Sequence, residues 1–60
     1  MTIEDIKSFN GHEVTDDQLK EIEESEFVSD VENYGENSIY PVLDWYIITL
    51  IDGQEINVFA

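Results

Sequence analysis

The C-terminal stretch LDWYIITLIDGQEINVFA, residues 43–60, places Asp52-Gly53 between two runs of β-branched and aromatic residues. An Asp-Gly pair in that setting is typical of a β-hairpin with a two-residue type I′ turn, because the turn needs a positive φ that glycine readily adopts. The sequence therefore predicts an antiparallel hairpin. Pairing outward from the turn gives three cross-strand pairs: Ile51 with Gln54, Thr49 with Ile56, and Ile47 with Val58.

This register divides the hairpin side chains between two faces, because successive residues of a strand point to opposite sides. The face expected to pack on the rest of the chain carries Trp45, Ile47, Thr49, Ile51, Ile56 and Val58. The other face is unusually apolar for one exposed to solvent. We expect the preceding connector or a second copy of the chain to cover it, so that dimerisation would complete the small sheet. The candidate self-association residues are Tyr46, Ile48, Leu50 and Phe59.

Two segments before the hairpin carry helix-start signals. In TIEDIKSFNG, residues 2–11, Thr2 is a candidate N-cap and the closing Asn-Gly pair is a typical helix stop. In the second segment, Thr15 and Gln18 have the spacing of a capping box, and Leu19 begins an apolar stripe. Both segments are therefore predicted to form short helices.

The stretch after the second helix has two interpretations. Phe27, Val31 and Tyr34 follow an i, i+4, i+7 spacing, which is typical of one face of a helix. This set is rotated by about 120° from the apolar stripe of the preceding helix, so one straight helix cannot bury both. The favoured prediction is a break near Ser25 followed by a third helix over residues 26–34, ended by Gly35. The alternative is a strand over FVSDVE, residues 27–32.

Together these patterns predict one α+β domain over residues 1–60, with two to three short N-terminal helices packed on a C-terminal antiparallel hairpin. A chain of 60 residues buries only about 60% of its unfolded surface, so its core is marginal. There is no cysteine, which excludes disulfides and thiolate zinc sites and favours a cytoplasmic protein. No apolar run approaches the roughly 20 residues that span a bilayer, so we expect no membrane partner.

Acidic residues dominate the surface chemistry. Fifteen Asp and Glu residues stand against Lys7 and Lys20, and the formal net charge is −13. The hydrophobic fraction of 42% lies in patterned segments, which favours a folded domain over disorder. Thirteen charges occupy roughly 22 Å of duplex DNA, and a compact chain of this length is roughly 27 Å across. The linear charge density is therefore close to that of DNA.

Other classes of site are disfavoured. DVENYGENSIYP, residues 30–41, has partial EF-hand spacing, but Tyr34 and Pro41 occupy two ligand positions. His12, the only histidine, has no nucleophile near it in sequence. We therefore expect no metal, no cofactor, no catalytic residue and no enzymatic activity. Direct nucleic-acid binding is opposed by the scarcity of cationic side chains.

The acids of the second helix suggest a binding surface for a basic protein. Asp17, Glu21 and Glu24 fall opposite its apolar stripe, with successive carboxylates separated by up to about 6 Å along the axis. This spacing is similar to that of phosphates, so a groove that normally holds DNA or RNA could accept it through charge-assisted hydrogen bonds. The predicted partner-binding surface consists of Glu13, Asp16, Asp17, Glu21, Glu24, Asp30, Glu32 and Glu36.

The length, the absence of Cys and Arg, the acid run from Glu13 to Glu36 and the Ile-rich hairpin resemble, in type, small inhibitors made by bacteriophages. These include anti-CRISPR, anti-restriction and uracil-DNA-glycosylase inhibitor proteins. The resemblance implies a basic, nucleic-acid-handling target in the cytoplasm of a bacterial host, blocked by DNA or RNA mimicry and steric occlusion. Two alternatives stay open: an immunity or antitoxin protein that neutralises a basic nuclease toxin, and a small structural dimer whose acids only maintain solubility.

Overall fold

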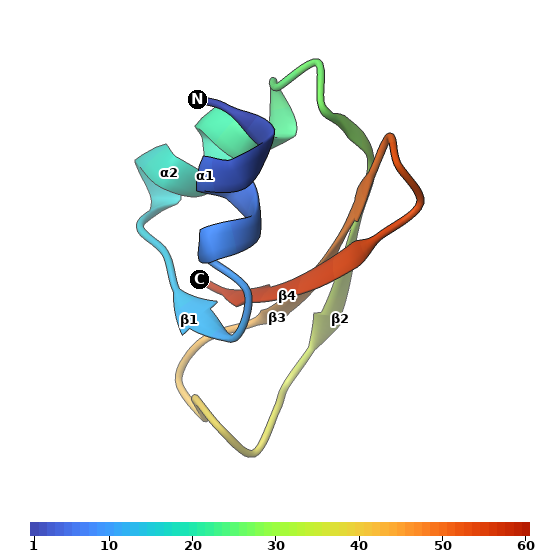
Figure 1. The fold of residues 1–60 in the computed structure, drawn as a ribbon. Coiled ribbons are helices and arrows are strands. Elements are labelled where there is room, and N and C mark those ends of the chain that lie inside the picture. Colours follow the sequence, from blue (N-terminus) through green and yellow to red (C-terminus); the bar gives the residue numbers. More distant parts are fainter.

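The computed structural model describes residues 1–60 as two helices that cover one face of a four-stranded sheet (Figure 1). The elements in chain order are α1 (Ile3–Ser8), β1 (His12–Glu13), α2 (Asp16–Glu23), β2 (Val28–Gly35), β3 (Trp45–Leu50) and β4 (Glu55–Phe59). The strand order is β1-β4-β3-β2, with β1 parallel to β4 and the other pairs antiparallel. The α+β class is confirmed, with four strands where a hairpin alone was expected. Neither helix is long and apolar enough to cross a membrane.

Both helices begin with a capping box. The Thr2 hydroxyl accepts a hydrogen bond from the Asp5 backbone N–H at 3.2 Å, and the Asp5 carboxylate accepts one from the Thr2 N–H at 3.1 Å. Thr15 and Gln18 make the same reciprocal pair at 3.1 and 2.9 Å. The capping box predicted for the second helix is therefore confirmed. Such caps satisfy backbone donors that helices this short would otherwise leave unpaired.

The third helix predicted over residues 26–34 is wrong, because this segment forms β2. α2 ends at Glu23, the chain turns through Ser25, and β2 then continues to Gly35. The break near Ser25 and the end at Gly35 agree with the sequence analysis. The secondary structure between these two points differs from the prediction, because it is a strand and not a helix.

An irregularity in β2 explains why its sequence resembles a helix. Val28 lies opposite Leu50 and Val31 lies opposite Ile48, so Ser29 is an extra residue in the ladder. This β-bulge places two valines three residues apart on the same face, whereas a regular strand would place residues two apart there. Apolar spacing by three is also what a helix produces. The bulge thus gives a strand the periodicity of a helix.

The turn between β3 and β4 contains three residues, 51–53, where the sequence predicted two. The Leu50 N–H donates to the Gln54 carbonyl at 2.8 Å, and the Gly53 N–H donates to the Leu50 carbonyl at 3.0 Å. Only Gly53 has a positive φ, +89°, so the hydrogen-bonded turn is type I followed by a glycine bulge. A type I′ turn would need two residues with positive φ.

The extra turn residue shifts the β3–β4 register by one, which moves every β3 side chain to the opposite face. Ile48 lies opposite Ile56 and is fully buried beneath the helices. Ile47 and Trp45, expected in the core, lie on the other face and are half-buried. The main core cluster consists of Ile6, Val14, Leu19, Ile22, Ile48, Leu50, Ile56 and Val58.

The predicted self-association face is not an exposed surface. Ile48 and Leu50 are 0% and 1% exposed within the core of the chain itself, and Tyr46 is half-buried on the same side of the sheet. Phe59 lies on the opposite side and is buried, with the Tyr40 ring 4.9 Å from its own. The loop between β2 and β3 therefore covers Phe59, and these four residues do not form a face for a second copy.

Replacing neighbouring isoleucines on β3 tests this register. Ile48→Ala should lower the free energy of unfolding by about 2–5 kcal/mol, because it leaves a cavity in the core. Ile47→Ala should lower it by less than half as much, since that side chain lies on the other face and is half-exposed. Urea denaturation followed by circular dichroism measures both, with Ile48→Val, expected to cost about 0.5–1.5 kcal/mol, as a milder variant. Equal losses at positions 47 and 48 would contradict the register.

Salt should stabilise the domain, because the structure contains one ion pair and a net charge of −13. The screening length falls from about 30 Å at 0.01 M salt to about 8 Å at 0.15 M. A screening length of about 8 Å is shorter than the radius of gyration of the domain, 10.5 Å, so repulsion between distant carboxylates is largely screened. Each kcal/mol of relieved repulsion should raise Tm by roughly 4–8 °C. Thermal unfolding across this range measures the effect, and a Tm that falls with salt would show that repulsion is not the dominant electrostatic contribution.

Candidate partner-binding surface

The outward side of α2 carries a row of carboxylates, here called the helix acid row: Asp17, Glu21 and Glu24. All three are exposed, whereas Leu19 and Ile22 on the opposite side of the helix are buried in the core. The capping box starts the helix at a defined residue, and the two apolar side chains set its rotation. The row therefore faces solvent as the sequence predicted.

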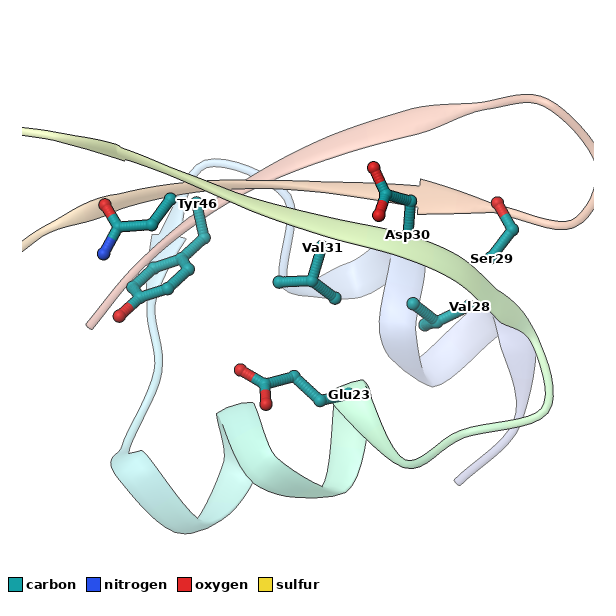
Figure 2. Close-up of a pocket in the computed structure, with 7 residues that line it drawn as sticks. Glu23, Val28, Ser29, Asp30, Val31 and Tyr46 are labelled. Atoms are coloured by element: carbon teal, nitrogen blue, oxygen red, sulfur yellow. The ribbon is translucent and has the colours of Figure 1, made fainter.

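The eight predicted partner-binding acids are all exposed, but they do not form one surface. Asp30 and Glu32 lie opposite Thr49 and Ile47, which places them on the face of the sheet away from the helices. Figure 2 shows Asp30 on the far side of β2 from α2. The helix acid row and the acids of β2 thus belong to opposite faces of the molecule. Of the other predicted acids, Glu13 lies in β1, Asp16 begins α2, and Glu36 follows β2.

The face of the sheet that the helices leave uncovered combines acids with aromatic rings, a feature that sequence reasoning missed. The Tyr34 and Trp45 rings lie 5.1 Å apart, and the Trp45 indole N–H donates to the Asn57 side-chain oxygen at 2.9 Å. Asp30 and Glu32 lie on the same face. Recognising a three-residue turn in the sequence would have placed Trp45 here, because the turn length sets the parity of β3.

Almost all of the negative charge is uncompensated. Lys7 contacts Asp52 at 2.8 Å, and this is the only ion pair, so one of fifteen side-chain carboxylates is paired. The hydrogen bond from Lys7, followed by the one from the Gln54 backbone, lowers the pKa of Asp52 below its usual value. The Lys7–Asp52 pair therefore stabilises the fold at pH values above the usual pKa of Asp, and this stabilisation is lost as the pH falls through the lowered pKa of Asp52. Lys20, on α2, is exposed and forms no ion pair.

A hollow of about 420 Å³ lies between the end of α2 and the inner side of β2 (Figure 2). Val28 and Val31 from β2 and Tyr46 from β3 point into it from the sheet, and all three are half-buried. Glu23 points into it from α2. The lining thus combines three apolar side chains and Glu23 with the polar residues Ser29, Asp30 and Asn33 of β2. The hollow runs alongside the edge of the sheet because β2 is the outermost strand.

No polar or charged side chain is buried in the structure. His12 is exposed on β1, and no group of three or more His, Asp or Glu side chains is arranged to hold a metal ion. The segment with partial EF-hand spacing, residues 30–41, is mostly extended strand and connector. The chemistry displayed at the surface is that of free carboxylates, aromatic rings and one open strand.

Comparisons with protein families, with curated proteins and with solved structures find no match to this chain.

The environment of Tyr34 yields a test of the uncovered sheet face. The Glu32 carboxylate, as hydrogen-bond acceptor and as negative charge, raises the pKa of Tyr34 above 10.0, with smaller contributions from desolvation, Glu55 and Asp30. An NMR titration of the tyrosine rings should show Tyr34 ionising above pH 10, and Glu32→Gln should move its pKa down towards 10. The stability that the neutral Tyr34 phenol contributes should be lost as the pH rises through the raised pKa of Tyr34.

Glu4→Gln, on α1, is the control for this titration, because Glu4 does not contribute to the Tyr34 pKa. An unchanged Tyr34 pKa in Glu32→Gln would contradict the placement of the two side chains on one face.

Proposed function

We propose that this chain is a non-enzymatic inhibitor that binds a basic, nucleic-acid-handling protein and blocks it by mimicking DNA or RNA. The observation that supports this most strongly is the helix acid row, which faces solvent with no cation paired to it. A protein with two lysines and fifteen acids attracts positively charged surfaces and repels nucleic acid.

The dimensions of the domain support mimicry of a duplex. Its longest extent is 29 Å and its shortest is 16 Å. Thirteen charges occupy roughly 22 Å of duplex DNA. The domain therefore carries charge at nearly the density of DNA over a body that fits within a nucleic-acid-binding groove, and occupancy of that groove would exclude the natural substrate.

The helix acid row is suited to contact with Arg and Lys side chains. Successive carboxylates are separated by roughly 4.5–6 Å along the helix axis. Arg binds carboxylates through two parallel hydrogen bonds, which are stronger than neutral ones. The helix fixes the backbone positions of the three acids before binding, so mainly side-chain freedom, and little backbone freedom, is lost there on association.

The target class we propose is a host-defence protein of the CRISPR or restriction type, acting in a bacterial cytoplasm. The supporting consideration is the resemblance in type to small acidic inhibitors made by bacteriophages. Inhibition by occupancy needs no cofactor and no catalytic residue.

Neutralising the helix acid row should abolish binding without unfolding the domain. The variant Asp17→Asn/Glu21→Gln/Glu24→Gln loses three charge-assisted hydrogen bonds to the partner, so affinity should fall about 100-fold or more. Its stability should be unchanged or higher, because like charges at i, i+4 repel. The matched control is Glu4→Gln/Glu26→Gln/Glu55→Gln, which removes the same charge from exposed positions on α1, on β4 and in the turn that follows α2.

The measurement is capture of bacterial proteins on the immobilised domain at low salt, elution by salt, identification by mass, and competition by duplex DNA or RNA. We expect basic nucleic-acid-binding proteins that the duplex displaces and that the triple variant no longer retains. Equal capture by the triple variant and the control would contradict a role for the helix acid row. Capture of a nuclease toxin would instead favour an immunity function.

A further inference from the structure

The outer edge of β2 is an unpaired strand edge, because β2 pairs only with β3. In an antiparallel pair, residues of a strand alternate between bonding to one neighbour and to the other. On the β4 side, the Leu50 N–H donates to the Gln54 carbonyl, and Asp44, just before β3, exchanges backbone hydrogen bonds with Ala60. The odd-numbered residues of β3 therefore bond towards β2, where Ile47 and Thr49 lie opposite Glu32 and Asp30.

It follows that Val31 and Asn33 direct their backbone N–H and C=O groups away from the sheet. Their side chains lie on the inner side, since Val31 is opposite Ile48 and Asn33 is opposite Tyr46. Bulges at Ser29 and Tyr34 bound this regular stretch. The open edge of β2 thus offers a short run of backbone donors and acceptors, bordered on its inner side by the hollow described above.

Charge selects what can pair with this edge. Asp30 and Glu32 are exposed on the outer side, and Glu23 faces the hollow on the inner side. A second copy of β2 would bring carboxylates against carboxylates, which is unfavourable for cross-strand neighbours. Charged residues on edge strands prevent self-association in this way. The same charges attract a strand that carries lysines or arginines.

We propose that the open edge of β2 binds an extended segment of the basic partner, which adds to the sheet as a fifth, antiparallel strand. Backbone hydrogen bonds to Val31 and Asn33 supply affinity, and alternate side chains supply specificity. Outward residues of the added strand are Lys or Arg opposite Asp30 and Glu32. The inward residue beside Val31 is a long basic side chain, whose stem packs against apolar residues of the hollow while its charge reaches Glu23. This proposal rests on the proposed function, because it assumes a basic partner.

A synthetic peptide tests the proposal on the intact chain. Acetyl-Lys-Val-Lys-Arg-Lys-Val-amide has lysines on one side and Val, Arg and Val on the other. NMR titration at low salt should show the largest shifts along β2, and hydrogen exchange at the Val31 and Asn33 amides should slow in the complex. In an antiparallel pair, hydrogen-bonded residues share a face, so the inward residues of the peptide provide the amides that face β2.

Backbone methylation separates strand addition from charge attraction. N-methylation of the inward Val and Arg residues should reduce affinity at least tenfold. N-methylation of the lysines, whose amides face away from β2, should leave affinity within about twofold. The two peptides have the same charge and composition. Equal binding by both, or weaker binding of the lysine-methylated peptide, would overturn antiparallel addition.

Variants of the protein identify which of its carboxylates contact the peptide. Asp30→Asn/Glu32→Gln should weaken binding of the peptide about tenfold, whereas Glu4→Gln/Glu26→Gln should change it by less than threefold. Glu23→Gln should weaken the Arg-containing peptide but not one with Val in place of Arg. Equal effects of the two double variants would overturn the proposal.

The pattern of shifts distinguishes the two proposals. Peptide binding confined to the helix acid row would overturn strand addition and leave the proposed function standing. If no basic peptide bound anywhere on the domain at low salt, both would fail.

Discussion

The three-residue turn between β3 and β4 determines how the rest of this molecule is arranged. Its two hydrogen bonds at Leu50, and the positive φ of Gly53, set the pairing of the two central strands. That pairing sends Ile48 and Leu50 towards the helices and Trp45 and Ile47 away from them. Because strand side chains alternate, one residue more or fewer in the turn would exchange the core and the exterior. The surface available to a partner is therefore a consequence of turn length.

The domain maintains a small core under strong self-repulsion. Nine residues are buried, all of them hydrophobic, and no buried polar group lacks a partner. Two capping boxes satisfy the helix starts locally, so the helices do not depend on ion pairs with the surrounding acids. The single ion pair links Lys7 on α1 to Asp52 in the β3–β4 turn. Asp5 caps α1 and Asp44 accepts a hydrogen bond from Asn33. The three carboxylates of the helix acid row take no part in the hydrogen bonds or the ion pair of the fold, which leaves them available for binding.

The arrangement of acids on two faces bears on how a partner could engage the domain. The helix acid row projects from the outward side of α2, and it suits a groove that normally receives nucleic acid. The edge of β2 offers backbone groups, and it suits an extended segment. The acids that would disfavour pairing of β2 with a second copy are the same acids that would favour a basic strand. The acids of β2 would thus serve both to keep the domain soluble and to recognise a basic strand.

The sequence by itself determined the features that depend on neighbouring residues: the two capped helices, the turn at Asp52-Gly53, the break near Ser25 and the exposed acids of α2. It did not determine the type of β2, because the bulge at Ser29 gives valines three apart a shared face, as a helix would. It also missed β1, which exists only because it pairs with β4. Turn length decided which face of the hairpin is covered, and two- and three-residue turns share the same Asp-Gly signal. The tertiary structure settled these points, since long-range pairing selects among local alternatives that the sequence leaves close in energy.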